Sequence, residues 1–196
     1  MVPPDPVGQA GRVTLDFRPL AEEDLPRLAS WLAAPHVRRW WPEAHDPASV
    51  RAAYLPMVVG SDPTEGLVVL RDGVAVGFVQ RYRIADDPAW RRTLALALGG
   101  PVGRAVGIDY LIGDERLVGR GLGRAVIAAL VDSTWVRYAD VPSIIVGVHQ
   151  ENRASWRALE GAGFRRLWGG RLESDDPSDA GPQYLYGVGR PPEAPR

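Results

Sequence analysis

The chain has 196 residues, 45% of them hydrophobic and 24% charged, which fits one globular domain with a sizeable core. With a formal net charge of −1, the chain has no overall electrostatic field that would favour binding to nucleic acid or to an anionic membrane. All 23 residues counted as lysine or arginine are arginine, which excludes a P-loop lysine and a Schiff-base lysine. The absence of cysteine excludes disulfides, thiolate metal ligands and a cysteine nucleophile, and we predict no metal site.

The first half of the chain predicts a strand, two helices and a hairpin. We expect residues 1–11 and 190–196 to be loose, with one domain over 12–189. Alternation over 13–18 predicts a strand, and apolar residues at helical spacing predict a helix over 22–33. A second helix is predicted to begin at Asp46 as cap with Pro47 in its first position. The apolar runs on either side of Asp72 and Gly73 predict a β-hairpin.

The second half predicts an alternation of strands and helices. Residues 84–104 are expected to form a long irregular functional loop. Strands are predicted over 105–112 and 143–149, helices from about residue 121 and over 152–163, and a closing antiparallel pair over 164–170 and 183–189. The expected fold class is therefore α/β (α+β): a single domain with a mixed central sheet, an antiparallel N-terminal meander and flanking helices.

The stretch "LVGRGLGRAV", residues 117–126, places glycines at 119, 121 and 123 directly before a helix. Unblocked N–H groups at a helix N-terminus attract phosphate. A Walker loop would need a lysine, and a dinucleotide fingerprint would need glycine where Arg124 stands. The stretch is predicted to bind phosphate in some other way, the alternative being that the glycines only satisfy turn geometry.

The sequence segments that contain and follow this glycine-rich loop indicate which kind of phosphate-binding protein it belongs to. The segments "GIDYLIGDERLVGRGLGRAVIAALV" and "IIVGVHQENRASWRALEGAGF" resemble the GNAT superfamily of N-acetyltransferases over about 105–168. The "GID", "GLG" and "AGF" motifs and the Trp40–Trp41 pair are most similar to aminoglycoside 6′-N-acetyltransferases. Lysine and siderophore-precursor N-acyltransferases share much of this but typically carry His where this chain has Asp109. The resemblance implies acetyl-CoA as co-substrate, a small-molecule amine as acceptor, and a monomer or homodimer.

The resemblance also implies a set of cofactor-binding residues. Arg116, Gly119 and Gly121 fit the superfamily's phosphate loop, and Gly123 is expected to extend the open backbone. Asn152, the single asparagine of the sequence, is expected to cap its helix, to contact the cofactor, or to do both. The complete set is Leu111, Ile112, Arg116, Val118, Gly119, Arg120, Gly121, Leu122, Gly123, Arg124, Asn152 and Ser155.

Acetyl transfer to an amine requires removal of a proton, because a primary amine with a pKa of about 10.4 arrives protonated at neutral pH. Asp109 matches the residue that serves as base in the resembling enzymes; it could instead anchor the ammonium group or pair with an arginine. The superfamily's frequent tyrosine acid falls on Leu159, which leaves the acid role to water, His149 or another tyrosine. An acidic substrate residue of the relatives falls on Gly147, and His149 lies two residues on, either as a substrate contact or as a polar strand end.

The early helices and the 84–104 segment are expected to select the substrate. Carboxylates suit a polycation, and tryptophans can stack on a sugar, although core packing is favoured for one of the two. The predicted substrate-binding residues are Trp40, Trp41, Glu43, Asp86, Asp87, Asp109 and His149. Two other readings stay open: a non-catalytic sensor of CoA or of an amine, and a biosynthetic acyltransferase acting on a protein N-terminus or a hydroxamate precursor. With apolar runs shorter than 18 residues and no secretory signal pattern at the start, we expect a cytoplasmic location.

Overall fold

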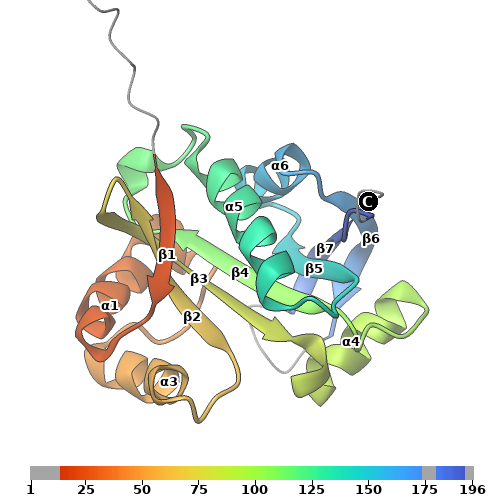
Figure 1. The fold of residues 1–196 in the computed structure, drawn as a ribbon, viewed down its shortest axis with the longest axis horizontal. Coiled ribbons are helices and arrows are strands. Elements are labelled where there is room, and N and C mark those ends of the chain that lie inside the picture. Colours follow the sequence, from red (N-terminus) through yellow and green to blue (C-terminus); the bar gives the residue numbers. More distant parts are fainter. Residues whose placement is uncertain (1–13, 174–179, 193–196) are drawn as a thin grey trace, which may run out of the picture.

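The computed structural model describes residues 14–173 and 180–192. A seven-stranded sheet forms the centre of the molecule (Figure 1). Its strands, in spatial order, are β1 (Leu15–Pro19), β2 (Glu65–Arg71), β3 (Val74–Arg83), β4 (Val106–Ile112), β5 (Ser143–His149), β7 (Gly181–Gly189) and β6 (Arg165–Leu172). Every neighbouring pair is antiparallel except β4 and β5, which run parallel. The mixed sheet with an antiparallel N-terminal meander is confirmed.

Helices cover both faces of this sheet. They are α1 (Leu25–Ala33), α2 (Pro35–Arg38), α3 (Pro47–Val59), α4 (Pro88–Leu98), α5 (Leu122–Arg137) and α6 (Arg153–Gly161). One core cluster joins α5 and α6 to the sheet, and Figure 1 shows α5 crossing in front of β4 with α6 beside it. The opposite face carries two further clusters, one under α1, α2 and α3 and one under α4. We call these two sides the α5 face and the α1 face.

Most predicted elements are present, with small shifts at their ends. The hairpin turns at Asp72 and Gly73, both with positive φ (50° and 79°), as a two-residue turn requires. The carboxylate of Asp46 accepts from the N–H groups of Ala48 and Ser49, which confirms it as the cap of α3. The helix predicted over 22–33 is divided into a 3-10 turn over 22–24 and α1.

The prediction of an irregular loop over 84–104 is wrong. A 3-10 turn at 84–86 leads into α4, which buries Trp90 and Leu94 against β5, β6 and β7. Asp87 caps this helix by accepting from the N–H groups of Ala89 and Trp90, and Gly99 ends it with φ of +69°. The Asp-Pro start and glycine end are the same signals that mark α3.

The parallel pair at the centre of the sheet is short. β4 and β5 are paired only at Val106 with Ile144 and Gly107 with Ile145, whereas β4 remains paired with β3 along its whole length. Beyond these residues the two strands diverge. A gap therefore opens in the sheet toward the carboxyl ends of β4 and β5.

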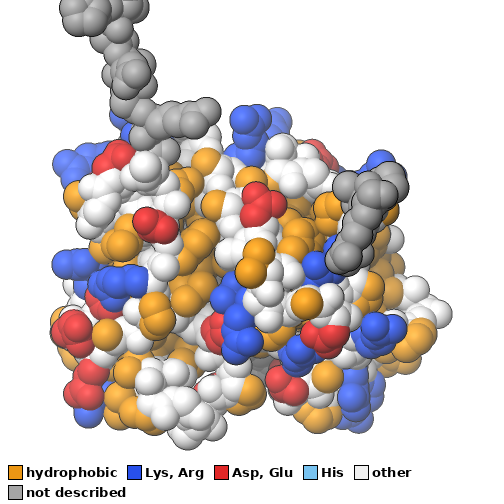
Figure 2. Space-filling view, in the orientation of Figure 1, with side chains coloured by type: hydrophobic (Ala, Val, Ile, Leu, Met, Phe, Trp, Pro, Cys, Tyr) orange, Lys and Arg blue, Asp and Glu red, His pale blue; other side chains and the backbone are white. Residues whose placement is uncertain are grey.

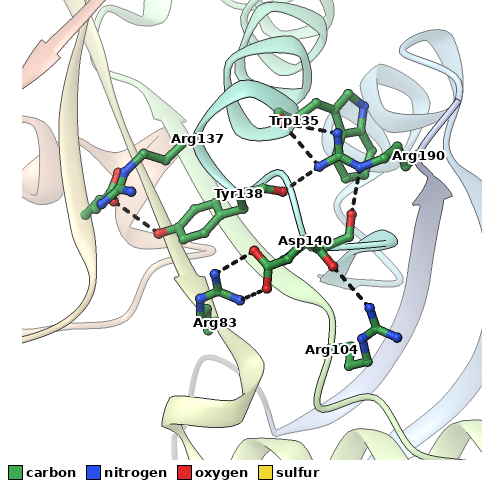
Figure 3. Close-up of polar contacts among 9 residues, drawn as sticks. Arg83, Arg104, Trp135, Arg137, Tyr138, Asp140 and Arg190 are labelled. Atoms are coloured by element: carbon green, nitrogen blue, oxygen red, sulfur yellow. Dashed lines mark hydrogen bonds and ion pairs between the residues drawn. The ribbon is translucent and has the colours of Figure 1, made fainter. Parts of the chain in front are cut away.

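The chain after β7 is fixed at its first residue. Arg190, placed at the start of the predicted loose tail, donates to the carbonyl oxygens of Trp135 and Tyr138 at the end of α5 and of Val141 after it (Figure 3). In the same region the Arg83 guanidinium binds Asp140 and holds the pKa of that carboxyl low, at about 2. At residue 190 the expectation of a loose tail is thus wrong.

The distribution of surface charge and the length of the helices concern possible binding to charged partners and to membranes. On the side seen in Figure 2, basic and acidic side chains are interspersed among apolar ones. No helix within the described ranges is both long and apolar enough to cross a membrane.

Candidate active site

A cavity of about 510 Å³ occupies the gap between β4 and β5. Residues from both faces of the sheet line it: Asp109 and Gly147 from the α1 face, Tyr110 and Val148 from the α5 face. All seven residues predicted to bind the substrate lie in its lining, namely Trp40, Trp41, Glu43, Asp86, Asp87, Asp109 and His149. The structure therefore brings together residues that are more than 100 positions apart in the chain.

Asp109 lies in the middle of β4 and is half-buried. It stands opposite Gln80 in the β3–β4 register, and the Gln80 Nε2 donates to its Oδ2 at 3.0 Å. A hydrogen-bond donor on the carboxylate favours its charged form and fixes its orientation. Asp109 therefore presents an oriented carboxylate to the cavity that it lines.

Other carboxylates of the lining are also held by the fold. Glu43 accepts from the hydroxyl of the buried Tyr54 at 2.8 Å, and Asp62 accepts from the N–H of Thr64 at 2.7 Å. One carboxylate oxygen of Asp87 accepts hydrogen bonds from N–H groups at the start of α4 and so caps that helix. The lining also contains Arg83, whose guanidinium is bound to Asp140 at 2.8 and 2.9 Å.

Aromatic side chains form one wall of the cavity. The rings of Trp40 and His149 lie 5.5 Å apart, and the Nδ1 of His149 accepts from the N–H of Glu151, so a neutral His149 carries its proton on Nε2. Trp41 packs edge-on against Phe78 in the core beneath α1. One tryptophan is thus partly a core residue and the other lies over the histidine, in line with the expectation that one of the two packs in the core.

The glycine-rich loop lies before α5 and fits an anionic ligand. Gly119 and Gly121 have φ of +76° and +82°, and a Cβ added at either position would meet no atom within 4 Å. The first N–H of α5 with a partner inside the helix is that of Ala125, so the N–H groups of residues 122–124 have no acceptor in the helix itself. Open backbone and donors together suit the pyrophosphate of CoA.

Some predicted cofactor residues have other contacts. Gly123 lies in the first turn of α5, where its N–H is among those without an acceptor in the helix and an added Cβ would stand 3.8 Å from Ala158 of α6. The exposed Arg116 binds Asp114 at 2.7 Å. The aliphatic part of Arg124 lies against Gly161. Leu122 is buried beneath α5, whereas Val118 and Arg120 are exposed on the loop.

The ends of β4 and α6 supply the remaining predicted residues. Leu111 is buried in the core on the α1 face, and the carbonyl oxygen of Ile112 accepts from the Nε2 of His36 at 2.9 Å. Asn152 caps α6 by accepting from the N–H of Ser155 at 3.2 Å. Both Asn152 and Ser155 also line the cavity, so the cap and a contact with the ligand are compatible.

Sequence reasoning missed several lining residues, among them Gln80, Tyr82 and Tyr110. Gln80 could have been found from the hairpin and the strand after it, because pairing those strands sets it opposite Asp109. Tyr110 was overlooked because it points to the opposite face from Asp109. Only the divergence of β4 from β5 lets both neighbours reach one cavity, and no local sequence signal reports that divergence.

Comparisons with known proteins agree with this geometry. The sequence matches the family described as acetyltransferase (GNAT) domain over residues 21–169. It is 28% identical over 158 residues to aminoglycoside N(6′)-acetyltransferase type 1 of Klebsiella pneumoniae, covering 78% of this chain and 75% of that protein.

Solved structures give the same result. The crystal structure of the aminoglycoside acetyltransferase AAC(6′)-Ib with coenzyme A superposes with a TM-score of 0.76 at 26% identity, covering 90% of this chain and 95% of that one. The complex of AAC(6′)-Ib with coenzyme A and kanamycin gives a TM-score of 0.75 at 26% identity, over 90% and 95% of the two chains. The expectation of acetyl-CoA as co-substrate agrees with these complexes. Because the family match spans most of the sequence, the chain belongs to the GNAT family of acetyltransferases.

Proposed function

We propose that this protein transfers acetyl from acetyl-CoA to the 6′-amine of an aminoglycoside. The observation that carries the proposal is the acidic lining of the cavity. Five carboxylates surround about 510 Å³: Glu43, Asp62, Asp86, Asp87 and Asp109. A cavity of this size suits a small ligand, and this density of negative charge suits a polyamine rather than a singly charged amine.

The relatives support the same substrate class. The curated relative and the superposed structures are aminoglycoside acetyltransferases by name, and the chain covers three quarters or more of each. At 26–28% identity the fold and the general chemistry carry over more securely than the choice of acceptor. The cavity carboxylates are this chain's own evidence for the acceptor.

The proposed roles follow from the two sides of the cavity. On the α1 face, Asp109 receives the proton of the attacking amine, while Gln80 keeps its carboxylate oriented. The remaining carboxylates bind the other ammonium groups, and Trp40 with His149 forms a wall against the sugar rings. On the α5 face, Gly119, Gly121 and the first turn of α5 bind the pyrophosphate of acetyl-CoA, the acetyl donor when bound.

A matched pair of antibiotics tests the acceptor. Neomycin carries an amine at the 6′ carbon and paromomycin carries a hydroxyl there, with the rest of the molecule unchanged. We expect acetyl-CoA-dependent thiol release with neomycin and none with paromomycin, which should still inhibit competitively. Mass spectrometry and NMR of the product should place the acetyl group on the 6′ nitrogen.

The alternatives predict different outcomes in the same assay. Release of thiol with an acyl-lysine or hydroxylysine substrate but not with neomycin would favour the lysine or siderophore-precursor acyltransferase. Saturable binding of CoA and neomycin without turnover of neomycin or of either lysine derivative would favour a non-catalytic sensor.

A further inference from the structure

Two hydroxyl groups meet in the cavity on the side opposite Asp109. Tyr110 on β4 and Ser155 on α6 both line it, and their oxygens are 2.7 Å apart. A pair of hydroxyls has two protons and needs only one for the bond between them. The second proton remains available to a ligand in the cavity.

The place of this pair in the fold indicates which ligand atom it meets. Neighbouring residues on a strand point to opposite faces, so Tyr110 lies on the α5 face and Asp109 on the α1 face. The glycine-rich loop and the cap of α6 are also on the side of α5 and α6. A CoA molecule held there reaches the gap from the α5 face with its sulfur end, and the amine reaches it from the side of Asp109.

The chemistry requires a donor at that sulfur. A thiolate released from the thioester belongs to a thiol with a pKa of about 8.5, so protonation or a strong hydrogen bond favours its departure at neutral pH. Val146 and Val148, which line the cavity from the same face, carry no donor in their side chains. Leu159, one turn beyond Ser155 on α6, is fully buried in the core and is equally without one.

We propose that Tyr110 is the hydrogen-bond donor that stabilises the leaving sulfur of acetyl-CoA, and that Ser155 is a positioning residue that acts through it. The substrate ammonium group first gives one proton to Asp109, which passes it to water. As the neutral amine nitrogen bonds to the acetyl carbon, the carbon–sulfur bond breaks and its electron pair stays on sulfur, while Asp109 takes the second nitrogen proton. The phenol of Tyr110 keeps its proton and donates a hydrogen bond to the departing thiolate, and the hydroxyl of Ser155 donates to the Tyr110 oxygen. Asp109 then releases its proton to water and the thiolate takes one from water, so the site returns to its starting state.

The electrostatic surroundings of Tyr110 support this role. Burial raises the pKa of its phenol, the bond to Ser155 lowers it, and the negative charge of Asp109 raises it. The phenol is therefore protonated when the reaction begins. A phenol that keeps its proton remains a hydrogen-bond donor to the thiolate throughout the reaction.

The inference rests on the acetyl transfer proposed above but not on the identity of the amine, so its decisive test uses CoA alone. The thiolate of bound CoA is followed by ultraviolet absorbance across pH, with the desulfo-CoA complex subtracted to remove the protein's own titration. In the native protein, donation from Tyr110 should raise the thiolate fraction at pH 7 about tenfold over free CoA. Tyr110→Phe should lose this gain while binding CoA within about twofold of the native affinity by calorimetry.

The second readout is the rate of turnover, measured with whichever amine supports thiol release in the assay described above. Tyr110→Phe should lower kcat by about 10²-fold with little change in KM. Ser155→Ala should lower kcat by about three- to tenfold, Ser155→Thr should restore most of it, and the double variant should be no slower than Tyr110→Phe alone. Tyr184→Phe is the matched control, because Tyr184 packs against the same core from β7 and lies outside the cavity lining.

The outcomes are distinct. An unchanged thiolate titration in Tyr110→Phe would overturn the proposal even if no aminoglycoside is turned over. Losses from Tyr110→Phe and Ser155→Ala that multiply in the double variant would overturn the linked pair, since Ser155 would then act independently. If Tyr110→Phe does not fold, the thiolate of bound CoA is titrated in Ser155→Ala and in Ser155→Thr instead. Because the Ser155 hydroxyl acts through Tyr110, the alanine variant should show a lower thiolate fraction than the threonine variant, and equal fractions would overturn the proposal.

Discussion

Asp109 shows how much a single residue depends on its position in the fold. Its carboxylate is half-buried in a β-strand, and a buried charge is costly unless it is paired or hydrogen-bonded. The amide of Gln80, directly opposite, supplies that bond at 3.0 Å. The hydrogen bond offsets part of the cost of burying the carboxylate and orients it in the gap where an amine can reach it.

Replacing this carboxylate tests its proposed role as base. Asp109→Asn keeps the size of the side chain but cannot accept a proton, so kcat at neutral pH should fall by about 10²–10⁴-fold. Since the amine deprotonates unaided near its own pKa of about 10.4, the variant should recover more of its rate toward pH 9 than the native enzyme gains. Asp86→Asn is the control for loss of charge alone and should raise KM while leaving kcat nearly unchanged. A loss confined to KM in Asp109→Asn would mean that Asp109 anchors the ammonium group.

At the scale of elements, the loop before α5 is defined by backbone conformation. Gly119 and Gly121 lie in the left-handed region, where residues with a Cβ are strained, and the space beside them is open. A Cβ added at either position would meet no protein atom within 4 Å. It would instead occupy the approach to the N–H groups of α5.

A valine at this position should therefore separate binding from folding. Gly121→Val is expected to weaken CoA binding by at least about 10²-fold in calorimetry, because branched bulk blocks the approach of the pyrophosphate. Positive φ adds a strain of about 1–3 kcal/mol, so the melting temperature should fall by a few degrees. Gly60→Val, at the left-handed end of α3, carries a similar strain without touching the loop and is the matched control. An unchanged dissociation constant would remove this loop from the cofactor site.

Elements with local signals were predicted from the sequence, and contacts between distant segments were not. Asp46 with Pro47 and Asp72 with Gly73 marked a helix start and a turn because capping and turn geometry involve only a few neighbouring residues. The Asp87-Pro88 start of α4 carries the same signal, although an irregular loop was expected over 84–104. The Tyr110–Ser155 contact spans 45 positions and depends on how β4 leaves β5, which no short stretch of sequence encodes.

At the scale of the whole molecule, Arg190 joins the last strand to the end of the longest helix. Its guanidinium donates to carbonyl oxygens of Trp135, Tyr138 and Val141, at and beyond the end of α5, where a helix leaves carbonyl groups without partners of its own (Figure 3). The ring of Trp135 also lies 4.9 Å from that guanidinium. The residue that follows β7 thus stabilises the helix that carries the glycine-rich loop at its other end.

Removing this contact should lower stability without changing the site. Arg190→Ala is expected to cost about 1–3 kcal/mol, seen as a lower denaturation midpoint with an unchanged slope in urea. Arg190→Lys keeps the charge but not the planar set of donors, and should recover only part of the loss. CoA affinity of the folded protein should stay within about twofold. Equal stability of the alanine and native proteins would show that water satisfies these carbonyls just as well.

The gap between β4 and β5 has a consequence for inhibition. The cavity is lined from both faces of the sheet, so a molecule that joins the amine to the sulfur of CoA would run through the sheet from one face to the other. Because the gap is open toward the carboxyl ends of the strands, such a bisubstrate compound leaves only after its contacts on both faces have broken together. Its residence time then depends on both sets of contacts at once, and it should be released much more slowly than either half alone.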